Sequence, residues 1–166
     1  QAFKANNFTK NNPNLKTALN KNEFKKNIVI ETKSDKKTNQ NFEEIFQKAQ
    51  SYANKRDYTN ALSYFKKAEE MDSFSVKLFY FWAHLEMDQG KLEEAKEHLK
   101  KTIYLDTSFI PAYFDLANIY EMDNDETKAN KMKQTTLKLL KNMKPDTTIK
   151  LLKNAKASEL IQYLEC

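Results

Sequence analysis

The sequence predicts an all-α protein in which three helix–turn–helix units form a right-handed solenoid that ends in a C-terminal capping helix. Three observations support this prediction. From residue 42 onward the sequence repeats with a period of 34 residues. Each repeat holds two apolar patterns with helical spacing, separated by a short polar turn. The 166 residues include one Gly, which excludes most glycine-dependent phosphate loops and tight β-hairpins.

The repeat appears as three series of residues that are spaced by 34 positions. The units that it defines are 42–75, 76–109 and 110–143. The three series are Ala49, Ala83 and Ala117; Ala61, Ala95 and Ala129; and Ile45, Phe79 and Tyr113. Short side chains let the two helices of a unit approach closely, while larger neighbours fill the gaps beside them. The recurrence of Ala therefore marks the contact between paired helices.

Each unit is expected to contain two helices joined by a polar turn. In the first unit, Ile45 and Ala49 share one face of the first helix, and the apolar residues between 61 and 68 share one face of the second. The polar turns are expected at residues 54–57, 88–90 and 123–125. Between units, N-cap side chains are expected from Asp72-Ser73 and from Asp106-Thr107-Ser108.

The two ends of the chain differ from the repeats. Residues 1–41 hold nine Lys, three acidic residues and ten Asn, which gives a net charge of +6 and the composition of a linker or tail. At the other end, residues 144–166 are expected to form a cap, with a closing helix over 157–164. Such a cap would cover the apolar surface that a solenoid exposes at its end.

A period of 34 residues with this helix–turn–helix pattern resembles the tetratricopeptide repeat family. The family's large–x–x–large–small pattern corresponds to Ile45/Lys48/Ala49, Phe79/Trp82/Ala83 and Tyr113/Leu116/Ala117. The match weakens in the third unit, where Lys133 and Thr136 stand at the later aromatic and small positions. The Pro expected near the end of a unit is replaced by Ser73 and Thr107. The resemblance implies a non-catalytic module that binds protein or peptide partners.

The order of the C-terminal pieces is also similar to the tetratricopeptide tails of chemotaxis-receptor methyltransferases. The segments that carry this similarity are 85–96, 103–114 and 157–164. It implies an upstream S-adenosylmethionine-dependent domain that methylates receptor glutamates, a linker over 1–41, and a tail that contacts chemoreceptors or signalling proteins. The alternative is a generic tetratricopeptide adaptor or scaffold in an unrelated pathway. Both hypotheses describe a cytoplasmic interaction module.

The tetratricopeptide resemblance also implies where a partner would bind, namely on the concave face that the first helices line. The expected partner-binding residues are Phe46, Gln50, Asn54, Tyr80, His84, Phe114 and Asn118. Each unit has an aromatic ring at its fifth place and an amide or imidazole group at its ninth place. Such rings can pack against the side chains of an extended peptide, and such polar groups can bond its backbone. Two alternatives remain open for the rings: contact with a neighbouring helix, or contact with the N-terminal segment Ile28-Val29-Ile30 of the same chain. Phe46 and Pro111 depart from the family's terminal-carboxylate groove.

Other function classes find little support in the sequence. There is no nucleophile–base pair, glycine-rich loop or clustered metal-ligand set, so we expect no enzyme activity, cofactor or metal in this chain. His84 and His98 are expected to be structural, and Cys166 lacks a local base. Residues 42–166 hold 19 basic and 20 acidic residues, a net charge of −1, which argues against nucleic-acid binding. The chain has no apolar run of membrane-spanning length, and a dimer is compatible with exposed aromatic residues.

Overall fold

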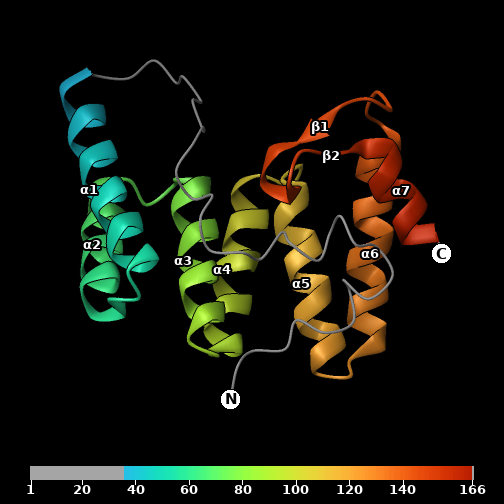
Figure 1. Ribbon diagram of the computed structural model, residues 1–166, viewed down its shortest axis with the longest axis horizontal. Helices are drawn as coiled ribbons and strands as arrows, with labels where there is room; N and C mark the ends of the chain where they lie inside the picture. Colours follow the sequence, from blue (N-terminus) through green and yellow to red (C-terminus); the bar gives the residue numbers. More distant parts are fainter. Residues whose placement is uncertain (1–35, 166) are drawn as a thin grey trace.

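A computed structural model describes residues 36–165, and in this part of the chain the all-α prediction is confirmed (Figure 1). Six helices form three antiparallel pairs, and a short hairpin and a seventh helix follow them. The helices are α1 Lys36–Asn54, α2 Tyr58–Met71, α3 Val76–Asp88, α4 Leu92–Leu105, α5 Ile110–Met122, α6 Glu126–Lys141 and α7 Ala157–Glu165. The hairpin comprises β1 Thr148–Ile149, the 3-10 turn η1 Lys150–Leu152, and β2 Ala155–Lys156. The N-terminal segment Ile28-Val29-Ile30 lies outside the described residues.

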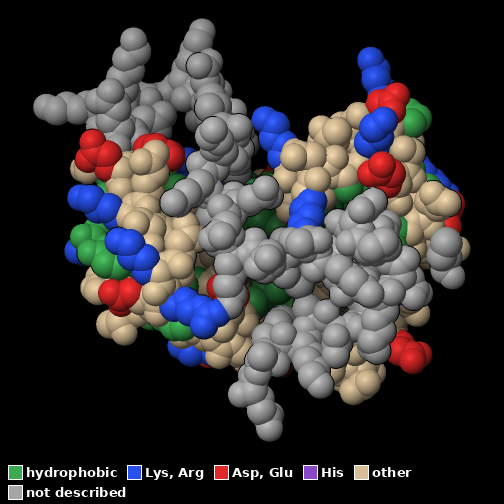
Figure 2. Space-filling model, in the orientation of Figure 1, with side chains coloured by type: hydrophobic (Ala, Val, Ile, Leu, Met, Phe, Trp, Pro, Cys, Tyr) green, Lys and Arg blue, Asp and Glu red, His purple; other side chains and the backbone are tan. Residues whose placement is uncertain are grey.

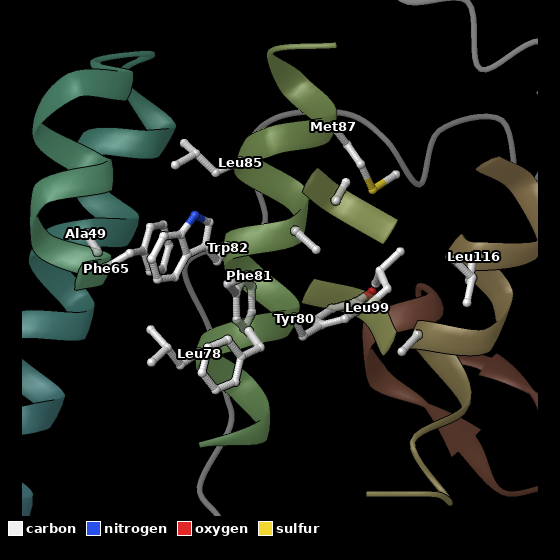
Figure 3. Packing of buried hydrophobic residues seen from close by; sticks show 14 of the residues in the cluster. Ala49, Phe65, Leu78, Tyr80, Phe81, Trp82, Leu85, Met87, Leu99 and Leu116 are labelled. Atoms are coloured by element: carbon white, nitrogen blue, oxygen red, sulfur yellow. The ribbon is translucent and has the colours of Figure 1, made fainter. Parts of the chain in front are cut away.

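Burial of the recurring alanines explains why the helices pair. Ala49, Ala61, Ala83 and Ala95 are fully buried, and Ala117 and Ala129 are nearly so. Larger side chains fill the space beside them, with Phe65, Phe79 and Leu99 also buried. Figure 3 shows this packing around α3, with Ala49 and Phe65 from the first unit lying on the side of Trp82. The alanines that recur every 34 residues, and that predicted close contact between paired helices, therefore lie in the hydrophobic core.

A left-handed backbone residue recurs in the turn of every unit. Arg56, Gly90 and Asn124 have φ values of 61°, 74° and 58°, and they are spaced by the repeat period of 34. Only the second unit uses Gly at this place, where a side chain carries a steric cost of about 1 kcal/mol or more. The three turns therefore share one conformation although their sequences differ.

This turn gives a stability prediction. We expect Arg56→Gly to raise the free energy of unfolding by about 0.5 to 1 kcal/mol, because Gly relieves the left-handed strain at the cost of a more flexible unfolded chain. Lys55→Gly is the matched control, since Lys55 is not among the positive-φ residues and Gly there should lower stability. Urea denaturation of both variants measures the difference. Equal effects at the two positions would contradict the argument.

The capping prediction between units is wrong. Asp72 and Asp106 are C-caps that end α2 and α4, and their carboxylates accept hydrogen bonds from the backbone N–H groups of Phe74 and Ser108 at 3.0 and 2.8 Å. The N-cap of α3 is instead Ser75, whose hydroxyl oxygen accepts from the N–H of Leu78. The Asp side chains hold the inter-unit turn itself, because the turn N–H groups are nearer to them than the next helix.

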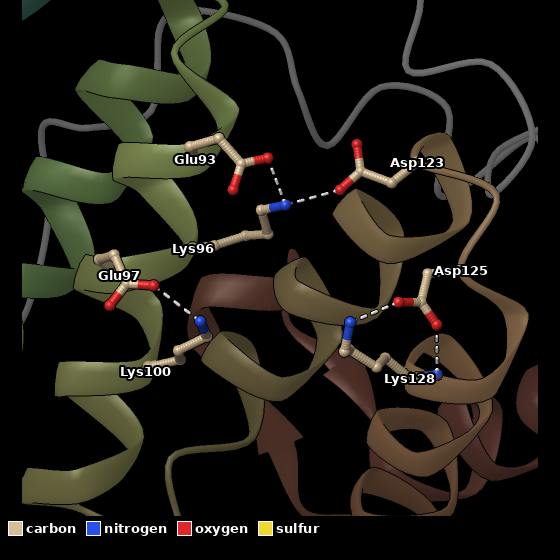
Figure 4. Close-up of polar contacts among 7 residues, drawn as sticks. All are labelled: Glu93, Lys96, Glu97, Lys100, Asp123, Asp125 and Lys128. Carbon is tan, nitrogen blue, oxygen red and sulfur yellow. Dashed lines mark hydrogen bonds and ion pairs between the residues drawn. The ribbon is translucent and has the colours of Figure 1, made fainter.

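A buried lysine joins the second unit to the third. The Lys96 ammonium donates to Glu93 at 2.6 Å and to Asp123 at 2.7 Å, so it bridges α4 and the turn after α5 (Figure 4). These two hydrogen bonds hold the pKa of Lys96 well above its usual value despite the opposing effect of burial. Glu69 and Lys101 form a similar bridge between α2 and α4.

The C-terminal cap contains an element that the sequence analysis did not include. The hairpin turns through Lys153 and Asn154, whose φ values of 59° and 57° are left-handed without a glycine. Thr148 pairs with Lys156 and Ile149 with Ala155 in an antiparallel register. The expected closing helix is present as α7, and Leu160 is buried in a second apolar cluster with Leu140 of α6.

Candidate functional site

The first helices of two neighbouring units form a pocket. Its lining consists of Gln50, Ala53, Asn54, Arg56, Phe65, Phe81, His84, Leu85 and Asp88. Among the expected partner-binding residues, Gln50 and Asn54 of α1 and His84 of α3 meet here. These residues are 30 or more positions apart in the sequence, and the stacking of α3 beside α1 brings them together.

The pocket has an apolar floor and a polar rim. The floor includes the rings of Phe65 and Phe81 and the side chain of Leu85, all of which belong to the main hydrophobic cluster. Amide, guanidinium, imidazole and carboxylate groups surround it. The enclosed volume is only about 40 Å³, far below the several hundred Å³ of typical small-molecule sites. Such a cavity suits one side chain of a longer ligand that lies across the surface.

Phe46 lies behind this floor rather than in the pocket lining. Its ring is 6.2 Å from that of Phe65 and 5.6 Å from that of Phe81, edge-on to both, and it stacks on Phe42 at 5.9 Å. Only 3% of Phe46 is exposed. The contact with neighbouring helices that the sequence analysis left open is therefore made, and Phe46 supports two pocket residues.

The buried side chains of Tyr80 and of Asp115 in α5 form a polar group with the half-buried His84. The Nε2 atom of His84 is 2.9 Å from a carboxylate oxygen of Asp115, and its ring lies edge-on to Tyr80 at 4.6 Å. Burial alone would lower the pKa of His84, but the negative charge of Asp115, its hydrogen bond and nearby Asp88 outweigh this and raise the pKa. Burial, together with Asp115, raises the pKa of the Tyr80 hydroxyl well above its usual value.

Asp88 supplies a carboxylate at the pocket rim. Partial burial at the pocket rim raises the pKa of Asp88, and the positive charges of His84 and Arg56 offset this only in part. The backbone around it ends α3, and the side chain itself remains exposed. Asp88 is therefore available to a cationic group that approaches the pocket.

Phe114 and Asn118 do not line the pocket. Phe114 is buried in the C-terminal cluster, where its ring is 6.4 Å from that of Tyr163 of α7. The Oδ1 atom of Asn118 is buried and has no hydrogen-bond partner within the described residues. The structure thus places these two expected site residues on the same helix as Asp115 but away from Gln50 and Asn54.

Several pocket residues were missed by the sequence analysis. Phe81, which lines the pocket, and Asp115, which bonds the pocket residue His84, occupy the sixth place of their units, whereas the expected groove places were the fifth, ninth, twelfth and thirteenth. The repeat period itself was the signal that would have paired them. Arg56 was assigned to the turn after α1, where it lies. Its place in the pocket lining depends on how α3 stacks beside α1.

The second histidine, His98, belongs to the interior of the second unit. Its ring stacks on Trp82 at 4.5 Å and on Phe79 at 5.9 Å, and its Nδ1 atom is 2.7 Å from a carboxylate oxygen of Glu86. Within the described part of the chain, no group of three His, Cys, Asp or Glu side chains is arranged to hold a metal ion. Among the helices that the structure describes, none combines the length and apolar character needed to cross a membrane.

Paired helices, stacked units and a pocket between first helices define this chain as a helical-repeat protein. A family model for the tetratricopeptide repeat matches residues 45–74 and 76–109, which correspond to the first two units. The chain is also similar to the TPR repeat-containing protein YpiA of Bacillus subtilis (strain 168), with 30% identity over 77 residues. That match covers 46% of this chain and 18% of YpiA, so the similarity spans less than a fifth of the relative. The first two units of the chain are therefore similar to tetratricopeptide repeats, and the third unit and the cap lie outside the matched residues.

Proposed function

We propose that this chain is a tetratricopeptide adaptor that binds an extended peptide segment of a partner protein across the concave face, with one apolar side chain in the pocket between α1 and α3. The observation that carries this proposal is the pocket lining, which combines an apolar floor with amide groups from the expected ninth and thirteenth places. An extended peptide presents both an apolar side chain and unpaired backbone groups.

The polar rim fits such a ligand. Gln50 and Asn54 lie one helical turn apart on α1, so their amides can donate to and accept from successive peptide groups. Phe65, Phe81 and Leu85 then bury the apolar side chain between these contacts. The charges of the described chain are mixed, and Figure 2 shows Lys and Arg beside Asp and Glu over the first helix pair. This mixture favours a protein ligand over the uniform negative charge of a nucleic acid.

The test is selection of ligands from a phage-displayed library of random peptides, followed by affinity measurement with one selected synthetic peptide. We expect the double substitution Gln50→Ala and Asn54→Ala to weaken binding by about thirtyfold, because each of the two lost hydrogen bonds contributes roughly 1 kcal/mol. The matched control is Ser63→Ala with Glu70→Ala, two exposed positions on α2 that do not line the pocket. Equal affinities for the native chain and the pocket variant, with both folded, would reject the proposed site.

The narrower hypothesis, a tail that targets a chemotaxis-receptor methyltransferase, rests on the similarity of residues 85–96, 103–114 and 157–164. Neither the matched family model nor the matched relative refers to chemotaxis or methyl transfer, so the generic adaptor is the better-supported proposal. Sequencing the gene upstream of the codon for Gln1 separates the two. A methyltransferase domain there would favour the tail, and an unrelated domain would favour the adaptor.

A further inference from the structure

We infer that the apolar triplet Ile28-Val29-Ile30 docks in the pocket between α1 and α3 and competes with the external ligand. The inference rests on the proposed function, because it assigns an internal competitor to the same pocket. The triplet lies outside the described residues, and its composition, its distance from α1 along the chain and the chemistry of the pocket support this placement.

The composition of the N-terminal segment singles out this triplet. Residues 1–41 are rich in Lys and Asn, and Ile28, Val29 and Ile30 form their one run of consecutive large apolar residues. All three are β-branched, which favours extended backbone. In an extended segment Ile28 and Ile30 point to the same side, so one of them can enter a pocket that accepts a single apolar side chain.

The length of chain before α1 matches the position of the pocket. From Lys36, where α1 begins, to Gln50 the helix rises about 21 Å over 14 residues. Ile28 lies eight residues before Lys36, and eight extended residues span up to about 27 Å. A segment that turns at the start of α1 and runs back along it can therefore reach Gln50, with a residue or two left for the turn.

Charge supports the same placement. Lys25 and Lys26 precede the triplet, so in this arrangement they lie beyond it, toward the end of α1 and the exposed carboxylate of Asp88. The rim also carries the positive Arg56, which opposes this attraction, so the lysines are drawn to the carboxylate of Asp88 alone. A tethered segment has an effective concentration in the millimolar range, so even a weak contact of this kind is populated.

The docking is measured in the full chain by paramagnetic broadening. A nitroxide is attached to Val29→Cys in a Cys166→Ser background, and amide signals are recorded by NMR. We expect the amides of Gln50, Asn54 and Leu85 to lose much of their intensity, since the unpaired electron of a nitroxide broadens the signals of nuclei that lie close to it. A nitroxide at Thr9→Cys is the matched control and should leave these signals unchanged.

A second variant separates docking from chance proximity. Ile28→Asp with Ile30→Asp, in the Val29→Cys chain, should restore the signals of Gln50 and Asn54, because charged side chains do not enter the apolar floor. In a chain with the native Val29, the same double substitution should tighten binding of the selected peptide by about tenfold, as expected if nine-tenths of the native pockets are occupied. Intact signals with the label at Val29, or broadening that survives the Asp substitutions, would overturn the inference.

The broadening experiment needs no external ligand, so its result is independent of the proposed function. Broadening by Val29→Cys combined with unchanged peptide affinity in the Gln50→Ala and Asn54→Ala variant would reject the proposed ligand site and keep the internal contact. Loss of peptide affinity in that variant without broadening would reject the internal contact and keep the ligand site.

Discussion

Phe65→Ala is expected to lower the free energy of unfolding by about 3 to 5 kcal/mol, the cost of removing a buried aromatic ring. Phe65 is 1% exposed, and its ring stacks on Trp82 of the second unit at 5.9 Å while contacting Phe46 of the first (Figure 3). The substitution therefore opens a cavity at the junction between two units. Urea denaturation followed by far-UV circular dichroism measures the loss.

The stability of a repeat array is approximately a sum of unit and interface contributions, so this variant should also lose coupling between its units. Trp82, the one Trp of the chain, lies at the affected junction. We expect its fluorescence to change at a lower urea concentration than the circular dichroism in Phe65→Ala, whereas the two coincide in the native chain. Phe74→Ala is the matched control, since Phe74 is 76% exposed and its loss should change stability by less than about 0.5 kcal/mol. Similar losses in the two variants would contradict this account of the core.

Asp115→Ala is expected to destabilise the fold by about 3 kcal/mol, because it leaves the imidazole of His84 and the hydroxyl of Tyr80 without their acceptor. Asp115 is 7% exposed and bonds His84 at 2.9 Å. Asp115→Asn keeps an acceptor oxygen and should cost less. Glu70→Gln, at an exposed position on α2, is the control and should leave the midpoint of urea denaturation unchanged. An Asp115→Ala variant as stable as the control would show that the contact contributes nothing.

The same contact has a defined pH dependence. The pKa of His84 is raised in the folded chain above its ordinary value of 6.5, so protonated His84 favours the folded state. This contribution is fully present below about pH 6.5 and is lost as the pH rises through the higher folded pKa. The stability advantage of the native chain over His84→Gln should therefore shrink as the pH rises above about 6.5 and through the raised pKa of the folded state. An advantage that grows with pH would contradict the assigned direction.

The core could be predicted from the sequence because its signal is local and repeated. Ala49, Ala83 and Ala117 recur at one period, and each position meets the partner helix of its own unit, so spacing alone identifies them as buried. The closing helix was likewise predictable, since Leu160 and its neighbours have helical spacing. These features depend on contacts between residues that are close in the sequence.

The details of the site depend on how one unit stacks on the next, which local spacing does not specify. Phe46, Tyr80 and Phe114 were expected to face a partner, yet each is buried against neighbouring elements: Phe81, Phe109 and Tyr163 respectively. The pairing of His84 with Asp115 joins positions 31 residues apart and depends on the rotation of α5 relative to α3. The turns that contain Arg56 and Asn124 were predicted, but their left-handed backbone was not, because neither residue is a glycine.

The position of the C-terminal helix α7 determines where a further repeat could be added to the array. Helix α7 packs on α6 as α3 packs on α2 and α5 on α4, so it occupies the place that a further repeat would take. Its exposed positions include Ser158, Glu159, Gln162 and Glu165, which offer a new unit no apolar surface. An additional 34-residue unit is therefore compatible with this architecture at an internal junction, such as the one between residues 109 and 110. There the new unit could pack against α4 on one side and α5 on the other, as these two helices now pack on each other. A module appended beyond α7 would meet a surface that contains Ser158, Glu159, Gln162 and Glu165 and is expected to fold as a separate body.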